Sequence, residues 1–292
     1  MNYLDITIPD AIRLSMRKRK SSTIYLRLRG GLGNQLFIYF AGLYYADKFN
    51  MNLKIDTRGS DHKFDLSEFS LPGRFSRNKL YWKIVDLCRL RNKVILESEI
   101  EDYFDLNSQK LKSFQLKGFF QNSFYFLDLK NKGVKISSKD CHTLLGTSKK
   151  KTKGSALIHI RGGDYLTHKE SLGCLSSEYY KEIINILHFE KIEDLFVLTD
   201  DEAHAKQILS NFHENRIHYL EKGLLRDFEC LAFFSSFNHI FLANSTYSWW
   251  GAQIARSDCQ VFAPTKWSKG GELKAEKLNL SNWKLIPSFW LD

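Results

Sequence analysis

An imidazole, a guanidinium and a carboxylate fall within six consecutive residues at positions 159–164, which read HIRGGD. The guanidinium of Arg161 is planar and always charged, so it can hold a carboxylate or a phosphate group through two parallel hydrogen bonds. Asp164 could act as a general base, or it could only pair with Arg161. An ion pair at the end of a strand, followed by an ordinary Gly-Gly turn, would explain the same residues equally well.

A glycine-rich loop occupies residues 30–35, which read GGLGNQ and precede a helical pattern of apolar residues. Glycines at such a place let a ligand approach the backbone, and the start of the following helix favours anions. The spacing differs from G-x-G-x-x-G, so it does not specify a dinucleotide. A tight turn without a ligand is the alternative.

Two adjacent carboxylates, Asp200 and Asp201, follow an apolar run over residues 195–199. They could accept hydrogen bonds from hydroxyl or N–H groups of a ligand. They could equally cap the helix that follows, since Asp is common at that position.

Hydroxyl residues mark a strand-to-helix junction at positions 244–251, which read NSTYSWWG. Backbone N–H groups, the hydroxyls of Ser245 and Thr246 and the helix dipole could together bind a diphosphate. A Ser or Thr helix cap followed by tryptophan packing is the alternative.

These side chains need strand ends and helix starts to position them, and the hydropathy pattern predicts both. The apolar run 156–160 is typical of a buried strand, which the glycines at 162–163 end. Strands are also predicted over 23–29, 52–56, 114–120, 195–199, 239–243 and 260–263. Helices are predicted over 123–130, 176–187, 202–212, 225–237 and 246–255, and over a segment that Asn34 caps and that ends at Phe49. Strands that alternate with helices predict an α/β fold with parallel sheets, whose carboxyl edge borders the ligand crevice.

Three parts are predicted along the chain. Residues 148–154 read SKKKTKG, which has the composition of a linker and separates two blocks of strands and helices. We therefore expect a basic tail over residues 1–22, which could also form a loose helix, an N-terminal domain over 23–150 and a C-terminal domain over 151–292.

The chain has 292 residues and a formal net charge of +10, so anionic partners are favoured. Basic clusters at 17–20 (RKRK) and 149–153 (KKKTK) contribute to this charge. No nucleic-acid-binding motif accompanies it, so nucleic acid is not the expected partner.

The five cysteines are odd in number and widely spaced, which argues against a disulfide framework and against a zinc site. A reducing compartment fits this usage. The sequence shows neither a long apolar run nor an apolar signal core. We expect a cytoplasmic protein that could touch an anionic membrane surface through its basic N-terminal segment.

Together, the four segments resemble the inverting fucosyltransferases, and most closely the bacterial α-1,2-fucosyltransferases of glycosyltransferase family 11. The matching stretches are GGLGNQLF, HIRGGDY, the strand that ends in TDD, and NSTYSWWGA. GFFQNSFYF at 118–126 and the Gly-Cys pair at 173–174 also fit. The resemblance covers about residues 25–264.

The resemblance implies transfer of L-fucose from GDP-β-L-fucose to the 2-hydroxyl of a terminal galactose in a glycan, such as an O-antigen, with inversion. It implies a GT-B-like fold of two Rossmann-like halves that face each other across a cleft, with the donor in the C-terminal half. No metal or other cofactor is implied, because Asp200 and Asp201 are adjacent and so differ from the Asp-x-Asp motif of metal-dependent transferases.

Residue roles follow from the same resemblance. Arg161 would grip the β-phosphate, His159 would lie near the diphosphate or the guanine, and Asn34 would face the transferred sugar. Asp164 completes the candidate catalytic group, although its pairing with Arg161 is an equal alternative. The donor-binding candidates are Gly31, Gly33, Gln35, Asp200, Asp201, Asp227, Asn244, Ser245, Thr246 and Ser248.

One position departs from the family pattern, His-x-Arg-Arg-x-Asp, because Gly162 replaces the second arginine. The cleft thus has one cation fewer. Three alternatives stay open at this point: an α-1,6-type fucosyltransferase, a protein O-fucosyltransferase, and a catalytically impaired protein that binds a GDP-sugar.

Overall fold

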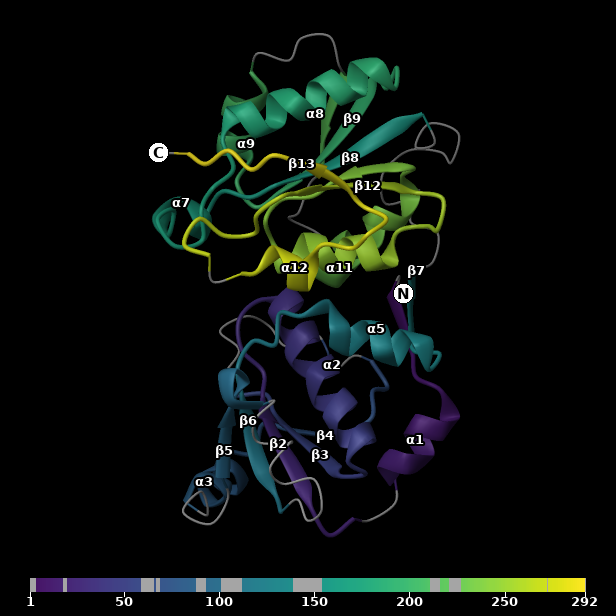
Figure 1. Ribbon diagram of the computed structural model, residues 1–292, viewed down its shortest axis with the longest axis vertical. Coiled ribbons are helices and arrows are strands. Elements are labelled where there is room, and N and C mark those ends of the chain that lie inside the picture. The colour runs from purple at the N-terminus through teal and green to yellow at the C-terminus, as the bar shows by residue number, and fades with distance from the viewer. Residues whose placement is uncertain are drawn as a thin grey trace. The chain divides into compact units, whose positions relative to one another are not determined.

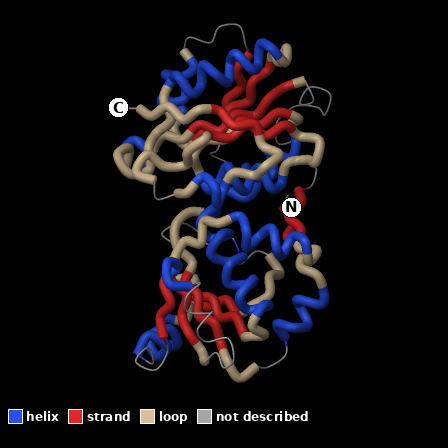
Figure 2. Tube along the Cα trace, viewed as in Figure 1, coloured by secondary structure: helices blue, strands red, loops and turns tan. Residues whose placement is uncertain are grey.

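The computed structural model describes residues 4–17, 20–58, 66, 69–87, 93–100, 112–138, 154–210, 216–220, 227–271 and 273–291. The chain divides into two compact units, an N-terminal unit over Ile6–Lys135 and a C-terminal unit that joins Met1–Asp5 to Ile136–Asp292 (Figure 1). Each unit has a parallel sheet and helices of its own, as Figure 2 shows. The chain therefore has the α/β class with parallel sheets that the sequence predicts.

The N-terminal unit is built on a five-stranded parallel sheet with the order β4-β3-β2-β6-β5. Its strands are β2 (Thr23–Arg27), β3 (Asn52–Asp56), β4 (Arg74–Ser76), β5 (Lys93–Leu96) and β6 (Phe114–Lys117). Its helices are α1 (Asp10–Arg17), α2 (Leu32–Lys48), α3 (Lys79–Leu87) and α5 (Ser123–Asn131), with a 3-10 turn η3 (Glu97–Glu99). Helix α2 approaches the sheet closely at Gly42, where an added Cβ would lie 2.7 Å from Leu26. This packing fixes the loop between β2 and α2, which carries the glycine motif.

The C-terminal unit is built on a six-stranded parallel sheet with the order β10-β9-β8-β11-β12-β13. Its strands are β8 (Ser155–Ile160), β9 (Asp194–Thr199), β10 (Arg216–Tyr219), β11 (His239–Phe241), β12 (Gln260–Pro264) and β13 (Lys284–Ile286). Its helices are α7 (Asp164–Thr167), α8 (Ser177–Phe189), α9 (Glu202–Leu209), α10 (Asp227–Ala232), α11 (Thr246–Ile254) and α12 (Ala275–Leu278), with a 3-10 turn η4 (Phe233–Ser236). Numbered from β8, this is the strand order 3-2-1-4-5-6 of the doubly wound nucleotide-binding fold.

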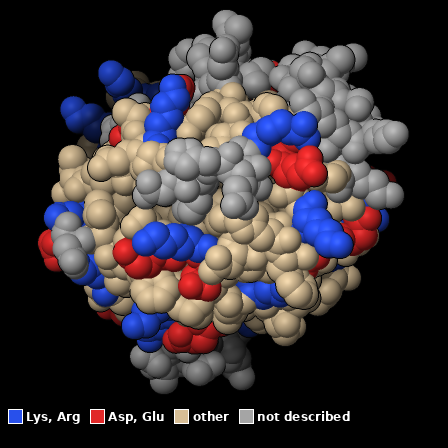
Figure 3. Space-filling model, turned by 90° about the horizontal axis from the view of Figure 1, so that it is seen from above, with Lys and Arg blue, Asp and Glu red and all other residues tan. Residues whose placement is uncertain are grey.

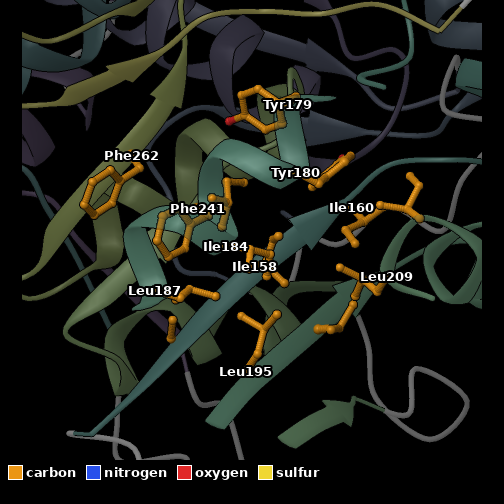
Figure 4. Packing of buried hydrophobic residues seen from close by; sticks show 14 of the residues in the cluster. Ile158, Ile160, Tyr179, Tyr180, Ile184, Leu187, Leu195, Leu209, Phe241 and Phe262 are labelled. Atoms are coloured by element: carbon orange, nitrogen blue, oxygen red, sulfur yellow. The ribbon is translucent and has the colours of Figure 1, made fainter. Parts of the chain in front are cut away.

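Strand β8 lies at the centre of this sheet, and all six of its residues are buried. Figure 4 shows Tyr180, Ile184 and Leu187 of α8 packed close to Ile158 and Ile160 of the strand. Full burial of each aliphatic side chain contributes roughly 1.5–3 kcal/mol. The end of β8 is therefore held firmly, and so are the residues that follow it.

Most predicted elements of the C-terminal half are confirmed within one or two residues. Two predicted helices differ in extent: the one over 202–212 ends at Leu209, and the one over 225–237 is the short helix α10 followed by η4. Asn34 does not cap α2, since the helix begins at Leu32 with Gly31 at the cap position. Glycine is among the residues favoured at the N-cap position, even without a side-chain hydrogen bond, so the helix can begin earlier than Asn34.

The predicted tail differs from the structure. Leu4, Ile6 and Ile8 alternate with polar residues and are at most 4 % exposed, and the first two belong to a strand, β1 (Leu4–Thr7). β1 pairs with β7 (Lys135–Ser138) in a separate two-stranded sheet. Helix α1 follows and buries Ile12. This alternation of apolar and polar residues, with a period of two, is the signal of a strand.

The change of unit falls between Lys135 and Ile136, earlier than the predicted boundary after residue 150. The lysine-rich cluster at 149–153, Lys18, Arg19, Cys88 and Cys141 lie outside the described residues. Among the residues that are described, no helix is long and apolar enough to cross a membrane.

Candidate functional site

The strand order of the C-terminal sheet reverses between β8 and β11, which are hydrogen-bonded neighbours. Residues that follow the two strands leave the sheet at its carboxyl edge, because the strands are parallel. In doubly wound sheets the crevice at this reversal is where ligands bind. The two segments that meet there are 161–164 and 244–246.

The guanidinium of Arg161 is held on several sides by its neighbours. One terminal nitrogen, Nη1, lies 2.6 Å from a carboxylate oxygen of Asp200, and the other pairs with Asp164. The Tyr165 ring lies under the guanidinium, with 4.7 Å between Cζ and the ring centroid. Nε is buried and has no hydrogen-bond partner among the described residues. The group is thus preorganised, with one donor unused.

The two carboxylates differ in how firmly they hold Arg161. The Asp164 side chain is 60 % exposed, whereas that of Asp200 is 18 % exposed. Exposed ion pairs contribute little to stability, because water competes with them. An incoming anion could therefore displace Asp164 from Arg161 more easily than it could displace Asp200.

The glycine turn after Arg161 is clamped by both predicted carboxylates. The Gly162 N–H donates to Asp200 over 3.0 Å, and the Gly163 N–H donates to Asp201 over 3.4 Å. A Cβ at position 162 would lie 2.6 Å from the Cβ of Asp201. Gly163 has a φ of +45°, which favours glycine. The close approach of the two loops explains the glycine at position 162.

Asp201 also begins helix α9. Its side chain accepts a hydrogen bond from the His204 N–H over 3.0 Å, and this bond lowers the pKa of the Asp201 carboxyl. The helix-cap alternative for Asp201 is therefore confirmed. No group of three or more His, Cys, Asp or Glu residues that could hold a metal ion occurs in the described part of the chain.

Helix α11 begins at the same crevice. Ser245 caps it by accepting a hydrogen bond from the Tyr247 N–H over 3.3 Å, and Thr246 is its first residue. Asn244 is buried, and its amide donates to the carbonyls of Leu172 and Gly173 over 3.2 and 3.0 Å. The Asn244 side-chain oxygen is buried without a partner among the described residues. The junction is therefore rigid and presents the start of a nine-residue helix.

Two side chains join Arg161 to this helix start. The Tyr165 hydroxyl, whose ring stacks on Arg161, donates to the Asn244 carbonyl over 3.1 Å. Burial raises the pKa of Tyr165, so the hydroxyl stays a neutral donor. His159 is 1 % exposed and pairs through Nδ1 with the hydroxyl of Ser248, which also accepts from the Ala243 N–H. The predicted residues His159 and Ser248 thus lie behind the site, where they connect strand β8 to helix α11.

Asp227 lies at the exposed start of α10, as part of the same unit. Its backbone carbonyl accepts a hydrogen bond of 2.6 Å from the Tyr247 hydroxyl. The contact involves the carbonyl and not the predicted carboxylate. It links α10 to the first turn of α11.

The glycine motif lies in the N-terminal unit, at the reversal of strand order between β2 and β6. Gln121, which follows β6, donates to the side-chain oxygen of Asn34 over 2.8 Å, and the Gln35 amide donates to the Gly30 carbonyl over 2.9 Å. The Gln35 side-chain oxygen is buried without a partner among the described residues. Gly31 faces open space, because an added Cβ there would meet no atom within 4 Å. Gly33 is buried in the first turn of α2.

The sequence analysis assigned no role to three residues near Arg161, which are Tyr165, Cys174 and His204. The Cys174 thiol lies 3.4 Å from the Arg161 carbonyl and 3.5 Å from Nε2 of His204. Burial raises the pKa of Cys174 to about 11 and lowers that of His204, so both stay neutral near pH 7. The only signal in the sequence was the presence of Tyr165 and Cys174 in stretches that match the family.

Known proteins that resemble this chain are glycosyltransferases. The family model of Glycosyl transferase family 11 matches residues 8–287. An "Alpha-1,2-colitosyltransferase" of Escherichia coli is 29% identical over 284 residues, which cover 87% of this chain and 95% of that protein. The "O-antigen biosynthesis glycosyltransferase WbnK" of the same organism is 24% identical over 307 residues, which cover 89% and 99%. Among solved structures, the fucosyltransferase NodZ from Bradyrhizobium aligns with a TM-score of 0.48 at 14% identity, covering 81% of this chain and 93% of that one.

Proposed function

Since the chain belongs to glycosyl transferase family 11 and is a fucosyltransferase-like glycosyltransferase that acts on glycans, we propose that it transfers L-fucose from GDP-β-L-fucose to the 2-hydroxyl of a terminal galactose. The product has an α linkage, because the hydroxyl attacks the face opposite the departing GDP. The enzyme works in the cytoplasm and releases GDP.

The observation that carries this proposal is the convergence of Arg161 and the start of α11, which Tyr165 joins. As the bond between the sugar and the diphosphate breaks, negative charge builds on the leaving GDP. Preorganised donors aimed at such charge are usually the largest contribution to catalysis. Arg161 supplies a fixed cation, and the backbone N–H groups and hydroxyls at Ser245 and Thr246 supply further donors.

The residues behind the site have positioning roles in this proposal. His159 and Ser248 hold the first turn of α11 against β8, and Asn244 fixes the junction between β11 and the helix. Asp200 orients Arg161, and Asp201 holds the glycine turn. Asp227 and the exposed edges of Asp200 and Asp201 remain the carboxylates proposed to contact the nucleoside.

The glycine motif of the N-terminal unit is the part of that unit that we propose to contact a sugar of the substrate. Gly31 lets the substrate approach the backbone, and Asn34 is held in place by Gln121. Gly33 lies in the first turn of α2. The side-chain oxygen of Gln35, which has no partner among the described residues, is the last member of the group proposed to contact the sugar.

Asp164 is the proposed carboxylate for the proton of the acceptor hydroxyl. Its exposure and its pairing with Arg161 fit a group that a bound diphosphate releases from the arginine. A reaction with strong positive charge on the sugar ring needs little help from a base, so the expected loss in an Asp164→Asn variant is smaller than in a variant of Arg161.

A second donor deserves the same test, because the curated relative at 29% identity is named an α-1,2-colitosyltransferase. Colitose is fucose without its 3-hydroxyl. A site that hydrogen-bonds this hydroxyl would reject the deoxy sugar strongly, whereas an apolar site would tolerate both.

In the deciding experiment, the purified protein is incubated with GDP-fucose or GDP-colitose and a panel of β-galactosides, and GDP release is measured. The linkage of the product is then determined by NMR. We expect GDP-fucose to be the better donor and an α-fucoside on O2 of galactose. A β-fucoside, or fucose on O3 or O6, would contradict the proposed linkage. Faster turnover of GDP-colitose would contradict the proposed donor.

A further inference from the structure

The N-terminal unit contains a pocket of about 880 Å³ that the proposed reaction does not use. Thr23, Asn52 and Arg74, the first residues of β2, β3 and β4, line it together with α1. The pocket therefore lies at the amino edge of the sheet. The glycine motif follows the last residue of β2 and lies at the carboxyl edge, so this is a separate site.

Among the residues that the structure describes, the pocket is lined by positive charge and by no carboxylate. Its cations are Arg13, Arg17, Lys20, Lys54 and Arg74. None of these five makes an ion pair with any residue that the structure describes. At the carboxyl edge of the same sheet, by contrast, Arg27 and Arg58 are both paired with Asp56 and Asp86.

Neutral groups hold the inner cations in place. The Arg13 guanidinium donates to the carbonyls of Ile8 and Ser70 over 3.0 and 2.7 Å. The Lys20 ammonium donates to the Met51 carbonyl over 3.2 Å, and the Lys54 ammonium lies 5.4 Å from the centre of the Tyr81 ring. These contacts hold the cations in place without an ion pair to any carboxylate of the described residues.

Burial lowers the pKa of the Lys20 ammonium, although Asp47 counteracts this shift. On the face that Figure 3 shows, by contrast, Lys and Arg are interspersed with Asp and Glu. A concave surface lined by one sign of charge concentrates ions of the opposite sign.

We propose that this pocket binds the phosphate headgroups of an anionic membrane surface. Charge complementarity supports this occupant, because several cations in one recess can meet more than one phosphate. Leu14 supports it further: this side chain is 56% exposed and lies on α1 one turn before Arg17. An exposed apolar side chain beside cations is typical of segments that enter the headgroup layer. The inference goes beyond the proposed function and does not depend on it.

The test measures binding of the full chain to lipid vesicles by sedimentation. Vesicles of phosphatidylcholine with one-quarter phosphatidylglycerol are compared with vesicles of phosphatidylcholine alone. We expect binding only to the anionic vesicles, and weaker binding as salt rises. Replacing Arg17 and Arg74 by Gln should weaken it about thirtyfold, since each charge near the surface contributes roughly fivefold.

The matched control is the Lys274→Gln, Lys277→Gln pair, which removes the same charge from exposed positions at α12. This pair should bind the vesicles within twofold of the wild type. Sugar transfer to a soluble acceptor is expected to be unchanged in both double variants, so the result stands whether or not the proposed donor is correct.

Three results would overturn the inference. Equal losses in the two double variants would mean that only net charge matters. Binding of inorganic pyrophosphate without any binding of vesicles would indicate a site for a soluble phosphate. Tighter binding of a short oligonucleotide than of the anionic vesicles would indicate nucleic acid.

Discussion

The Arg161 side chain combines charge with a fixed orientation, since Asp200 and the Tyr165 ring hold it from two sides. Arg161→Lys keeps the charge but loses the planar fork and the stacking. We expect kcat/KM for GDP-fucose to fall at least a hundredfold, or by about 3 kcal/mol of transition-state stabilisation. A GDP-release assay at varied donor concentration measures the change.

Arg256→Lys is the matched control for this variant. Arg256 also pairs with a nearby carboxylate, that of Asp258, but both side chains are at least half exposed. This variant should keep kcat/KM within twofold. Near-normal turnover in Arg161→Lys would contradict the proposed role of the guanidinium.

Gly162 has no space for a side chain, since its Cβ would lie 2.6 Å from that of Asp201. Gly162→Ala must push the glycine turn away from α9, and such overpacking costs about 1–3 kcal/mol. Urea unfolding should show this loss in the free energy of unfolding. Gly154→Ala is the control, because a Cβ there meets nothing within 4 Å, and its change should stay within about 0.5 kcal/mol.

The sequence predicts which residues lie near Arg161 at the end of the strand, but it does not predict their tertiary contacts. His159, Arg161 and Asp164 were placed at one strand end from the apolar run and the two glycines that follow it. The burial of His159 under α11 was not predictable, because it depends on Ser248, 89 positions later in the chain. Tyr165 was missed for the same reason, since its partner carbonyl belongs to Asn244.

At the scale of elements, the start of α11 is both a structural cap and the proposed anion site. Ser245→Ala removes the side chain that accepts from the Tyr247 N–H, which typically costs about 1 kcal/mol of stability. It also removes a proposed donor to the diphosphate, so we expect kcat/KM to fall about tenfold. Thermal unfolding and the GDP-release assay measure the two effects.

Ser176→Ala separates the two effects, because Ser176 caps α8 in the same way, by accepting from the Glu178 N–H. Its stability should fall by a similar amount while kcat/KM stays within twofold. Equal losses of activity in the two variants would show that stability alone explains the effect of Ser245.

Because Asp201 caps α9 through its carboxylate, the free energy of unfolding should depend on pH. The hydrogen bond from the His204 N–H lowers the pKa of the Asp201 carboxyl below its ordinary value of 3.8. A carboxyl with a lowered pKa in the folded state stabilises the fold above its unfolded pKa, and this stabilisation is lost as pH falls further. Below pH 3.8, the free energy of unfolding should therefore fall more steeply in the wild type than in Asp201→Asn. Parallel curves in urea unfolding at several pH values would contradict this assignment.

The elements of the C-terminal unit were predictable because their apolar runs are long and strands alternate with helices. The middle of the N-terminal unit was not, since β4 and β5 have three and four residues and α3 buries only Trp82. Short strands carry little periodicity, and their pairing in the sheet decides their existence. The basic pocket could not be predicted either, because α1, β3 and β4 supply its cations from distant positions.

At the scale of the whole molecule, the cations of the two units differ in whether carboxylates lie beside them. Arg161 is paired with carboxylates in the C-terminal unit, whereas the described lining of the amino-edge pocket in the N-terminal unit contains none. A paired arginine can exchange its partner for a substrate phosphate without a large change in charge. An unpaired cluster attracts anions at longer range, so salt should weaken vesicle binding more than it weakens donor binding.

The last prediction concerns the charge that builds on GDP during transfer. Arg161 and the start of α11 meet at one crevice, and Tyr165 holds them together. A cation and a helix start can stabilise a leaving diphosphate as a divalent metal ion does in other transferases. Asp200 and Asp201 are already engaged by the glycine turn, by Arg161 and by α9. We therefore expect the rate of GDP release to stay within twofold after treatment with EDTA, and to be unchanged when Mg²⁺ or Mn²⁺ is added back. A preparation that EDTA silences and Mn²⁺ restores would return these two carboxylates to consideration as metal ligands.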